Sequence, residues 1–240
     1  IAPFLTMRAY EQIRVNLSLH AQIKNLNVNL IGVGAGLSYG ISGPTHHCFE
    51  DIIIMRTLPN FVVFSPSDWV LAKSFVDYSL KVRRPKYIRL DGQALPQIHT
   101  DLNDEDLMNG FKEIEKGENV CLLSTGYMTH KSIEAAGLLN ASGIKTGIID
   151  VFLIKPLKEK LFFEAINKYK YLLTLEEAFI EKGGLDSLVL SLLNKNNSNI
   201  KLKGLGFKDA YVFDMGSREH LHKLNNLDAE SIIREIKGLL

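Results

Sequence analysis

The residues best suited to acid–base chemistry are two adjacent histidines, His46 and His47, in the stretch Gly-Pro-Thr-His-His-Cys-Phe-Glu-Asp that starts at residue 43. The Gly-Pro pair favours a turn, and Thr45 is placed to cap an amphipathic helix over 47–57. A histidine at such a helix entrance faces free backbone N–H groups and the positive end of the helix dipole, which favour an anionic or oxygen-rich ligand. The residues alone leave two interpretations open, a proton-transfer site or a packing and capping pair.

The elements around the histidines predict a parallel sheet that presents a ligand at one edge. A short apolar strand runs directly into a glycine-rich loop over 32–40, which lets a ligand approach the backbone at the carboxyl edge of a sheet. Helices and strands then alternate, as in βαβ folds. The predicted elements are a helix over 7–26, a strand over 28–33, the helix over 47–57, a strand over 61–64, a helix over 68–82 and a strand over 86–90.

A change in composition predicts two domains. Between residues 93 and 116 the apolar periodicity fades and acidic residues accumulate, so we interpret 101–116 as a linker between a first domain, 1–100, and a second, 117–240. The second domain again has an α/β pattern. Its predicted strands cover 120–124, 146–151, 171–175 and 200–206, its helices cover 128–142, 158–167 and 185–195, and a final helix capped by Asp228 runs to Leu239.

The composition favours a cytoplasmic protein. Lys and Arg number 28 against 27 Asp and Glu, a net charge of +1 that predicts no binding to nucleic acid or to an anionic membrane. The two cysteines, Cys48 and Cys121, fall in separate predicted domains without metal-ligand spacing, which argues for a reducing compartment and against a disulfide framework or a metal site. No apolar run reaches the roughly 20 residues that span a bilayer, and the N-terminus does not resemble a secretory signal.

The two histidines also belong to a longer ordered pattern. Residues 29–68 follow the order strand, glycine-rich loop, GPTH, helix, LPN, strand and PSD, and YIRL at 87–90 and LPQ at 95–97 come next. In this order they resemble the pyrimidine-binding domain of the transketolase family of thiamine-diphosphate enzymes, and the second half of the chain is similar to the family's C-terminal domain. The resemblance implies an α/β fold of two domains, each a mainly parallel sheet flanked by helices.

The resemblance implies thiamine diphosphate as the cofactor, divided between two domains that usually lie on different subunits. One domain binds the diphosphate and Mg²⁺, and the other, which this chain resembles, binds the aminopyrimidine ring. The family's Mg²⁺ motif is absent and its catalytic glutamate belongs to a segment before Ile1, so we expect a missing preceding segment and Mg²⁺ ligands on a partner domain. The implied partners are a diphosphate-binding subunit or domain, in a homodimer or heterotetramer, and sugar or sugar-phosphate substrates.

The resemblance also implies roles for single side chains. Phe4 matches the phenylalanine that stacks on the aminopyrimidine, with Arg8 as a second cofactor contact; the alternatives are a core phenylalanine and a surface arginine. His46 matches the histidine that assists proton transfer to the substrate, whereas His47 is interpreted as structural. Arg89 matches the arginine that grips the sugar phosphate, and would otherwise be a salt-bridge partner at the end of a strand.

Two positions depart from the family pattern. Gly34 replaces a histidine and Ser42 replaces an aspartate, both of which help to bind the sugar in typical transketolases. We keep both positions as candidate substrate contacts, since a glycine loop can approach a ligand through its backbone. Their side chains leave the acceptor undetermined and permit a small or unphosphorylated one.

The sequence therefore predicts a transketolase-like subunit or fragment that transfers a two-carbon ketol unit from a ketose donor to an aldose acceptor. One alternative is another thiamine-diphosphate enzyme, of the deoxyxylulose-phosphate synthase or 2-oxo-acid dehydrogenase β type. A second alternative is a non-catalytic assembly subunit that has lost the chemistry. The GPTHH and LPN motifs favour transketolase, while Gly34 and Ser42 add weight to the assembly subunit.

Overall fold

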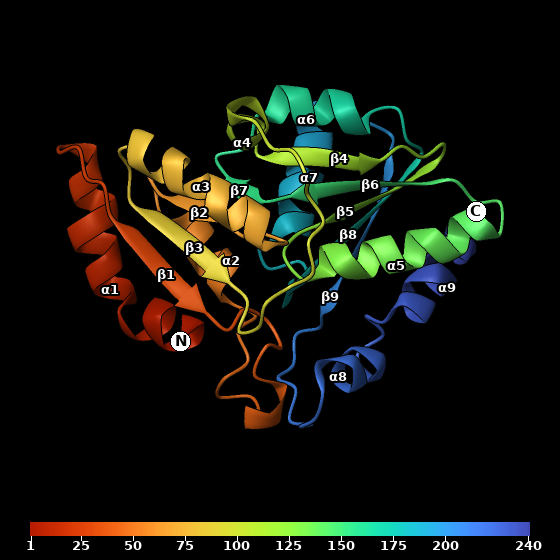
Figure 1. The fold of residues 1–240 in the computed structure, drawn as a ribbon, viewed down its shortest axis with the longest axis horizontal. Coiled ribbons are helices and arrows are strands. Elements are labelled where there is room, and N and C mark those ends of the chain that lie inside the picture. Colours follow the sequence, from red (N-terminus) through yellow and green to blue (C-terminus); the bar gives the residue numbers. More distant parts are fainter.

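The computed structural model describes all 240 residues, which form two packed sheets flanked by helices (Figure 1). The strand order is β1-β3-β2-β7 in the first sheet and β4-β6-β5-β8-β9 in the second. The strands are β1 (Asn29–Val33), β2 (Val62–Phe64), β3 (Lys86–Leu90), β4 (Phe111–Glu115), β5 (Val120–Ser124), β6 (Thr146–Val151), β7 (Leu153–Lys155), β8 (Tyr171–Phe179) and β9 (Lys201–Phe207).

The second sheet has helices on both faces, as expected for a mainly parallel sheet. Strands β6, β5, β8 and β9 are parallel, and only the edge strand β4 is antiparallel. Every residue of β5 is buried, and successive side chains alternate between the two faces. Val120 and Leu122 pack with residues of α5 (Met128–Ala141) and α9 (Ala229–Leu239). Cys121 and Leu123 belong to the core that contains α6 (Glu159–Ile166) and α7 (Leu185–Lys195). The predicted α/β class is confirmed.

The first sheet takes its last strand from the second half of the chain. Strands β1, β3 and β2 are parallel, and β7 pairs antiparallel with β2. The sequence did not predict β7, because only Phe152 separates it from β6 and the run 146–155 resembles one apolar segment. The largest core also contains residues from both sheets, such as Met55, Val63, Ile149 and Leu185. The two sheets therefore share one hydrophobic core.

The N-terminal helical segment and three other helices flank or connect the sheets. The segment runs from Phe4 to Gln22, rather than over the predicted 7–26, and includes wide π-type turns. In chain order the segment is η1 (Phe4–Arg8), α1 (Tyr10–Gln12), η2 (Ile13–Leu19) and η3 (His20–Gln22). Helix α3 (Trp69–Lys81) begins where predicted, because the Asp68 carboxylate accepts a hydrogen bond from Leu71 N at 2.8 Å. The others are α2 (Asp51–Thr57) and α8 (Arg218–Leu224), the second of which was not predicted.

The predicted start of the helix after the histidines was wrong. Helix α2 begins at Asp51, not at residue 47. Two backbone hydrogen bonds between Gly36 and Cys48, of 3.1 and 3.0 Å, hold Cys48 extended against the glycine-rich loop, so the helix cannot begin before this bridge ends. Thr45 therefore caps no helix, and His46 lies in a turn rather than at a helix N-terminus.

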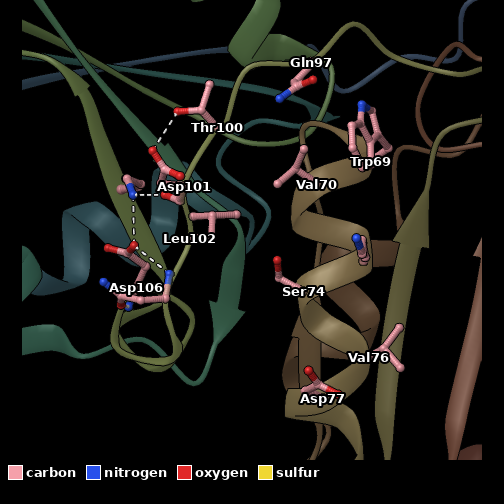
Figure 2. A pocket seen from close by; sticks show the side chains of 13 residues that line it. Trp69, Val70, Ser74, Val76, Asp77, Gln97, Thr100, Asp101, Leu102 and Asp106 are labelled. Atoms are coloured by element: carbon pink, nitrogen blue, oxygen red, sulfur yellow. Dashed lines mark hydrogen bonds and ion pairs between the residues drawn. The ribbon is translucent and has the colours of Figure 1, made fainter.

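The predicted linker contains regular structure. Its acidic residues start helix α4 (Asp104–Asn109), in which the side chains of Asn103 and Asp106 each accept a hydrogen bond from the other residue's backbone N–H. Residues 111–115 then form β4 of the second sheet. An open groove of about 760 Å³ separates α3 from this connection (Figure 2), and Lys112 at its edge is bonded to Asp101 and Asp106. None of the helices is both long and apolar enough to cross a membrane.

Candidate active site

His46 and Phe4 lie together on the surface, although they are far apart in the sequence. Their ring centroids are 5.4 Å apart with the planes at 71°, an edge-to-face contact. The His46 Nδ1 atom is hydrogen-bonded to the Thr45 hydroxyl at 2.9 Å, and Nε2 makes no bond within the chain. Phe4 is 41% exposed. The pair presents an aromatic face and an unpaired imidazole nitrogen side by side.

His47, predicted as structural, is buried with 3% of its surface exposed, and its ring lies 5.6 Å from that of Phe49. Burial lowers the pKa of His47, which favours the neutral imidazole. Arg8 is exposed and makes no hydrogen bond or ion pair within the chain. The two neighbouring histidines therefore have different environments, and only His46 can meet a ligand.

The two departures from the family pattern have different settings. Gly34 is buried and has a φ of +94°, a left-handed conformation that a side chain rarely adopts. A Cβ at this position would overlap the ring of Tyr39, so the space beside Gly34 is already filled. Ser42 is exposed and makes no side-chain hydrogen bond within the chain. Ser42 is thus free to contact a ligand, and Gly34 can contribute only backbone atoms.

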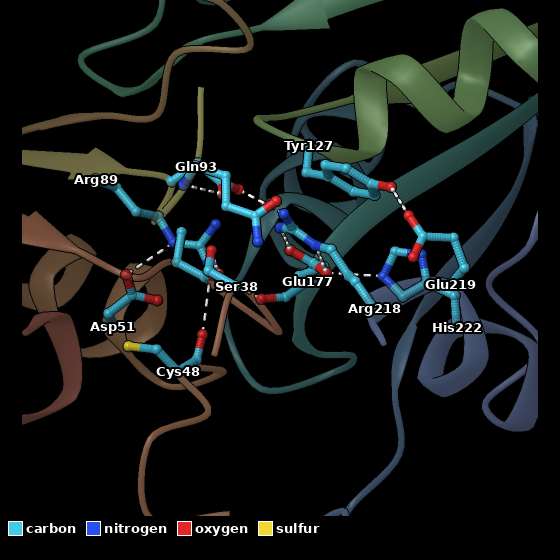
Figure 3. A network of polar contacts seen from close by, with 12 residues as sticks. Ser38, Cys48, Asp51, Arg89, Gln93, Tyr127, Glu177, Arg218, Glu219 and His222 are labelled. Carbon is cyan, nitrogen blue, oxygen red and sulfur yellow. Dashed lines mark hydrogen bonds and ion pairs between the residues drawn. The ribbon is translucent and has the colours of Figure 1, made fainter. Parts of the chain in front are cut away.

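Arg89 is not at the surface, and this setting does not match the one that we expected of a phosphate clamp. Its side chain is 2% exposed, and Nε donates to Asp51 Oδ2 at 2.7 Å (Figure 3). Its Nη2 donates to the carbonyl oxygens of Cys48, at 3.1 Å, and Glu177, at 2.9 Å. A phosphate could reach Arg89 only if these bonds broke. The substrate role of Arg89 stays a prediction, and in this structure the guanidinium connects the His46 loop, α2 and β8.

The charge of Arg89 is matched inside the protein. Burial alone would lower the pKa of Arg89, but the Asp51 carboxylate outweighs it and raises that pKa above its ordinary value. The hydroxyl of Tyr87 donates to the same Asp51 oxygen at 2.7 Å, and burial raises the pKa of Tyr87. The two strand residues and the first residue of α2 thus form one buried unit.

A second polar network joins the two domains and was not predicted. Arg218 Nε donates to Glu177 Oε1 at 2.9 Å, Nη2 donates to Glu177 Oε2, and Nη1 donates to Asp91 Oδ2 at 2.6 Å (Figure 3). His222 Nε2 is 2.7 Å from Glu177 Oε1. Burial alone would raise the pKa of Glu177, but Arg218 and His222 outweigh it, so that the pKa lies well below its ordinary range. The guanidinium also stacks 3.6 Å above the ring of Tyr127.

The Glu-Glu and Gly-Gly pairs of the second half are structural, as expected. Both oxygens of Glu176 accept backbone hydrogen bonds, from Leu185 N at 2.8 Å and Asp186 N at 2.9 Å. The carboxylate therefore fills the N-terminus of α7 that Gly184 opens, where an external anion would otherwise bind. Burial raises the pKa of Glu176 to about 7. The structure contains no group of three or more His, Cys, Asp or Glu side chains that could hold a metal ion.

Comparison with known proteins agrees with this arrangement of two domains. The pyrimidine binding domain of transketolase matches residues 2–97, and the C-terminal domain of transketolase matches residues 111–232. One of the two subunits of the apulose-4-phosphate transketolase of Actinobacillus succinogenes is 35% identical over 233 residues, which cover 97% of this chain and 73% of that protein. This chain belongs to the transketolase family. The family is thiamine-diphosphate-dependent, and its enzymes are transferases.

Other relatives of this transketolase-family chain include split and fused enzymes. A solved split-gene transketolase, described as an inactive β4 tetramer, superposes with a TM-score of 0.83 at 29% identity over 99% of this chain and 73% of that one. The 1-deoxy-D-xylulose-5-phosphate synthase of Aquifex aeolicus is 28% identical over 97% of this chain but only 36% of its own length. The predicted family and the predicted transketolase-like function are confirmed.

We predict that Arg89→Ala lowers the free energy of unfolding by about 3–5 kcal/mol, because it leaves the buried Asp51 carboxylate without its partner. Urea unfolding measures this loss. Lys145→Ala is the control, since it removes an exposed ion pair with Glu118 and should cost less than about 1 kcal/mol. Unchanged stability in Arg89→Ala would contradict the structural role and restore the phosphate-clamp interpretation.

We also predict that the two neighbouring glutamates give opposite pH dependences. The lowered pKa of Glu177 adds stability that is present above its ordinary pKa of 4.5 and is lost as the pH falls below that value. The raised pKa of Glu176 has the opposite effect, so its contribution declines as the pH rises from 4.5 through about 7. Urea unfolding from pH 3 to 8 measures both limbs. Glu177→Gln should flatten the acid limb only; an equally steep acid limb in this variant would refute the assignment.

Proposed function

We propose that this chain is the pyrimidine-binding and C-terminal subunit of a transketolase, which transfers a two-carbon ketol unit from a ketose donor to an aldose acceptor. The observation that carries the proposal is the exposed Phe4–His46 pair, within a chain that belongs to the family. A partner domain would bind the diphosphate and Mg²⁺, because this chain has no metal-ligand cluster of its own. The two unpaired, buried cysteines support the cytoplasm as the proposed compartment.

The Phe4–His46 surface suits the aminopyrimidine and thiazolium rings of thiamine diphosphate. The exposed face of Phe4 can pack on a flat heteroaromatic ring, and Arg8 is exposed in the same helical segment, where we propose that it makes a second cofactor contact. When bound, thiamine diphosphate supplies the carbon nucleophile and the electron sink needed to break and form carbon–carbon bonds beside a ketone.

His46 is proposed as the acid–base residue. Because the Thr45 hydroxyl holds Nδ1, the imidazole ring is oriented and Nε2 remains for a substrate hydroxyl or carbonyl oxygen. The imidazole can take a proton from a hydroxyl and return it to a developing alkoxide at neutral pH. Ser42, exposed in the same loop, is proposed as a nearby hydroxyl contact to the sugar.

The partner subunit is proposed to dock on an exposed apolar surface beside the His46 turn. Ile41 is 78% exposed, Phe213 77% and Met215 66%. Met215 lies against Gly43 in the His46 turn, so these residues and the exposed Phe4 surround the proposed site. Apolar side chains gathered in this way mark an interaction surface more often than a solvated one. Docking there would complete the cofactor site in a homodimer or heterotetramer.

Two observations bear on the alternative functions. The likeness to a 1-deoxy-D-xylulose-5-phosphate synthase fits the second enzyme hypothesis, in which the donor is a 2-oxo acid rather than a ketose. The inactive β4 tetramer of the split-gene relative supports the view that one chain assembles without activity until its partner is present. Activity assays with both donor classes, with and without the partner, distinguish the three hypotheses.

We predict that His46→Ala lowers kcat/KM by roughly two orders of magnitude in the enzyme reconstituted with its partner, thiamine diphosphate and Mg²⁺, since it removes general acid–base assistance. Cofactor affinity and folding should change little. The control is His47→Ala, which removes a buried imidazole and should act on stability more than on turnover. Near-normal turnover in His46→Ala would leave the assembly-subunit hypothesis as the better one.

We predict that Phe213→Asp weakens association with the diphosphate-binding subunit at least tenfold, because it places a charge in the apolar surface. Analytical ultracentrifugation of the mixed chains measures the effect. Leu138→Asp changes an equally apolar residue of α5, which is 54% exposed but lies outside this surface, and should leave association unchanged. Equal affinity in both variants would show that the partner binds elsewhere.

A further inference from the structure

A second cavity, of about 330 Å³, lies at the boundary between the two domains. One wall is the loop over 37–42 that leads to the His46 turn, and another is the loop after β3 that contains Gly92 and Gln93. The second domain contributes Tyr127 and residues 216–219. This volume is within the usual size of small-molecule sites, which begin at about 300 Å³. Every lining residue comes from this chain, so the cavity exists without a partner.

Tyr39 shapes the cavity by filling space between two glycines. A Cβ at Gly34 would overlap the Tyr39 ring, and a Cβ at Gly92 would lie 3.2 Å from Tyr39 Cε1. The ring therefore occupies the room that larger side chains at these two positions would need. The Tyr39 side chain lines the cavity and is partly exposed, and its hydroxyl makes no hydrogen bond within the chain. The wall thus offers a neutral donor and acceptor.

The cavity has no uncommitted positive charge. Arg218 is the only basic residue that lines it, and its guanidinium is already bonded to Glu177 and Asp91. Glu219 lines the cavity as a third carboxylate. One guanidinium therefore faces three carboxylates, and a phosphate ester would be repelled rather than gripped. Hydroxyl groups, in contrast, find partners in Tyr39, Ser42 and Gln93, whose side chains make no hydrogen bond within the chain.

We infer that this cavity binds the uncharged, hydroxyl-bearing end of a sugar, and that Tyr39 makes the chain select free aldoses over their phosphate esters. The inference rests on the proposed function for the identity of the ligand as a sugar. Tyr39 acts as a specificity residue through its ring, which excludes a larger polar side chain, and through its hydroxyl, which bonds the ligand. Carboxylates around Arg218 add discrimination against anions.

The test is binding of matched ligands to the full chain, followed by ¹H–¹⁵N NMR of the amides of Gly40, Gly92 and Gly216. Ribose should shift these signals, and ribose 5-phosphate should bind at least tenfold more weakly. Equal or tighter binding of the ester, or no shift with either ligand, overturns the inference. Because this readout needs no turnover, loss of activity in His46→Ala tests the proposed function separately.

Two variants locate the discrimination. Tyr39→Phe keeps the ring against Gly34 and Gly92 and should weaken ribose binding about fivefold through loss of one hydrogen bond. Gln93→Arg adds a free cation and should strengthen binding of ribose 5-phosphate at least tenfold. Gln97→Arg, whose side chain lines the other groove, is the control and should change neither affinity. Wild-type ribose affinity in Tyr39→Phe, or unchanged ester affinity in Gln93→Arg, overturns the role given to this cavity.

Discussion

The guanidinium of Arg89 is the contact on which the arrangement of the candidate site depends. It leaves the carboxyl end of β3 and bonds to the start of α2 through Asp51, to the His46 loop through the Cys48 carbonyl, and to β8 through the Glu177 carbonyl. A buried cation with these partners has no lower-energy alternative without them, because exposing or orphaning the charge is costly. The turn that carries His46 is therefore fixed against both sheets by one side chain.

Much of the fold could be predicted because its strands are continuous apolar runs. Strands β3, β5 and β6 lie at their predicted residues, since full burial on both faces leaves a clear signal in the sequence. Pairing between distant segments leaves no such signal. The three residues of β7 gain their structure only from β2, and the acidic residues at 104–106, interpreted as a linker, stabilise the first turn of α4. Local charge alone does not distinguish a helix start from a solvated connection.

The candidate site could be predicted only in part for a similar reason. His46 stands in a recognisable motif, and its neighbour Phe4 followed from the resemblance. The burial of Arg89 did not follow, because an arginine at the end of a strand has the same sequence pattern whether it faces a ligand or the interior. The partners of Arg218 lie 41 and 127 residues away, so no spacing in the sequence could indicate them.

Strand β7 limits how the two domains can be recombined. It lies beyond the whole of β4, β5 and β6 in the sequence, yet it supplies the last strand of the first sheet. A cut in the connection at 101–116 would leave the backbone of β2 with an open edge on that side. The pyrimidine and C-terminal domains therefore cannot be exchanged between relatives as independent modules: a chimera that joins halves from two proteins would need to take residues 153–155 from the same parent as β2.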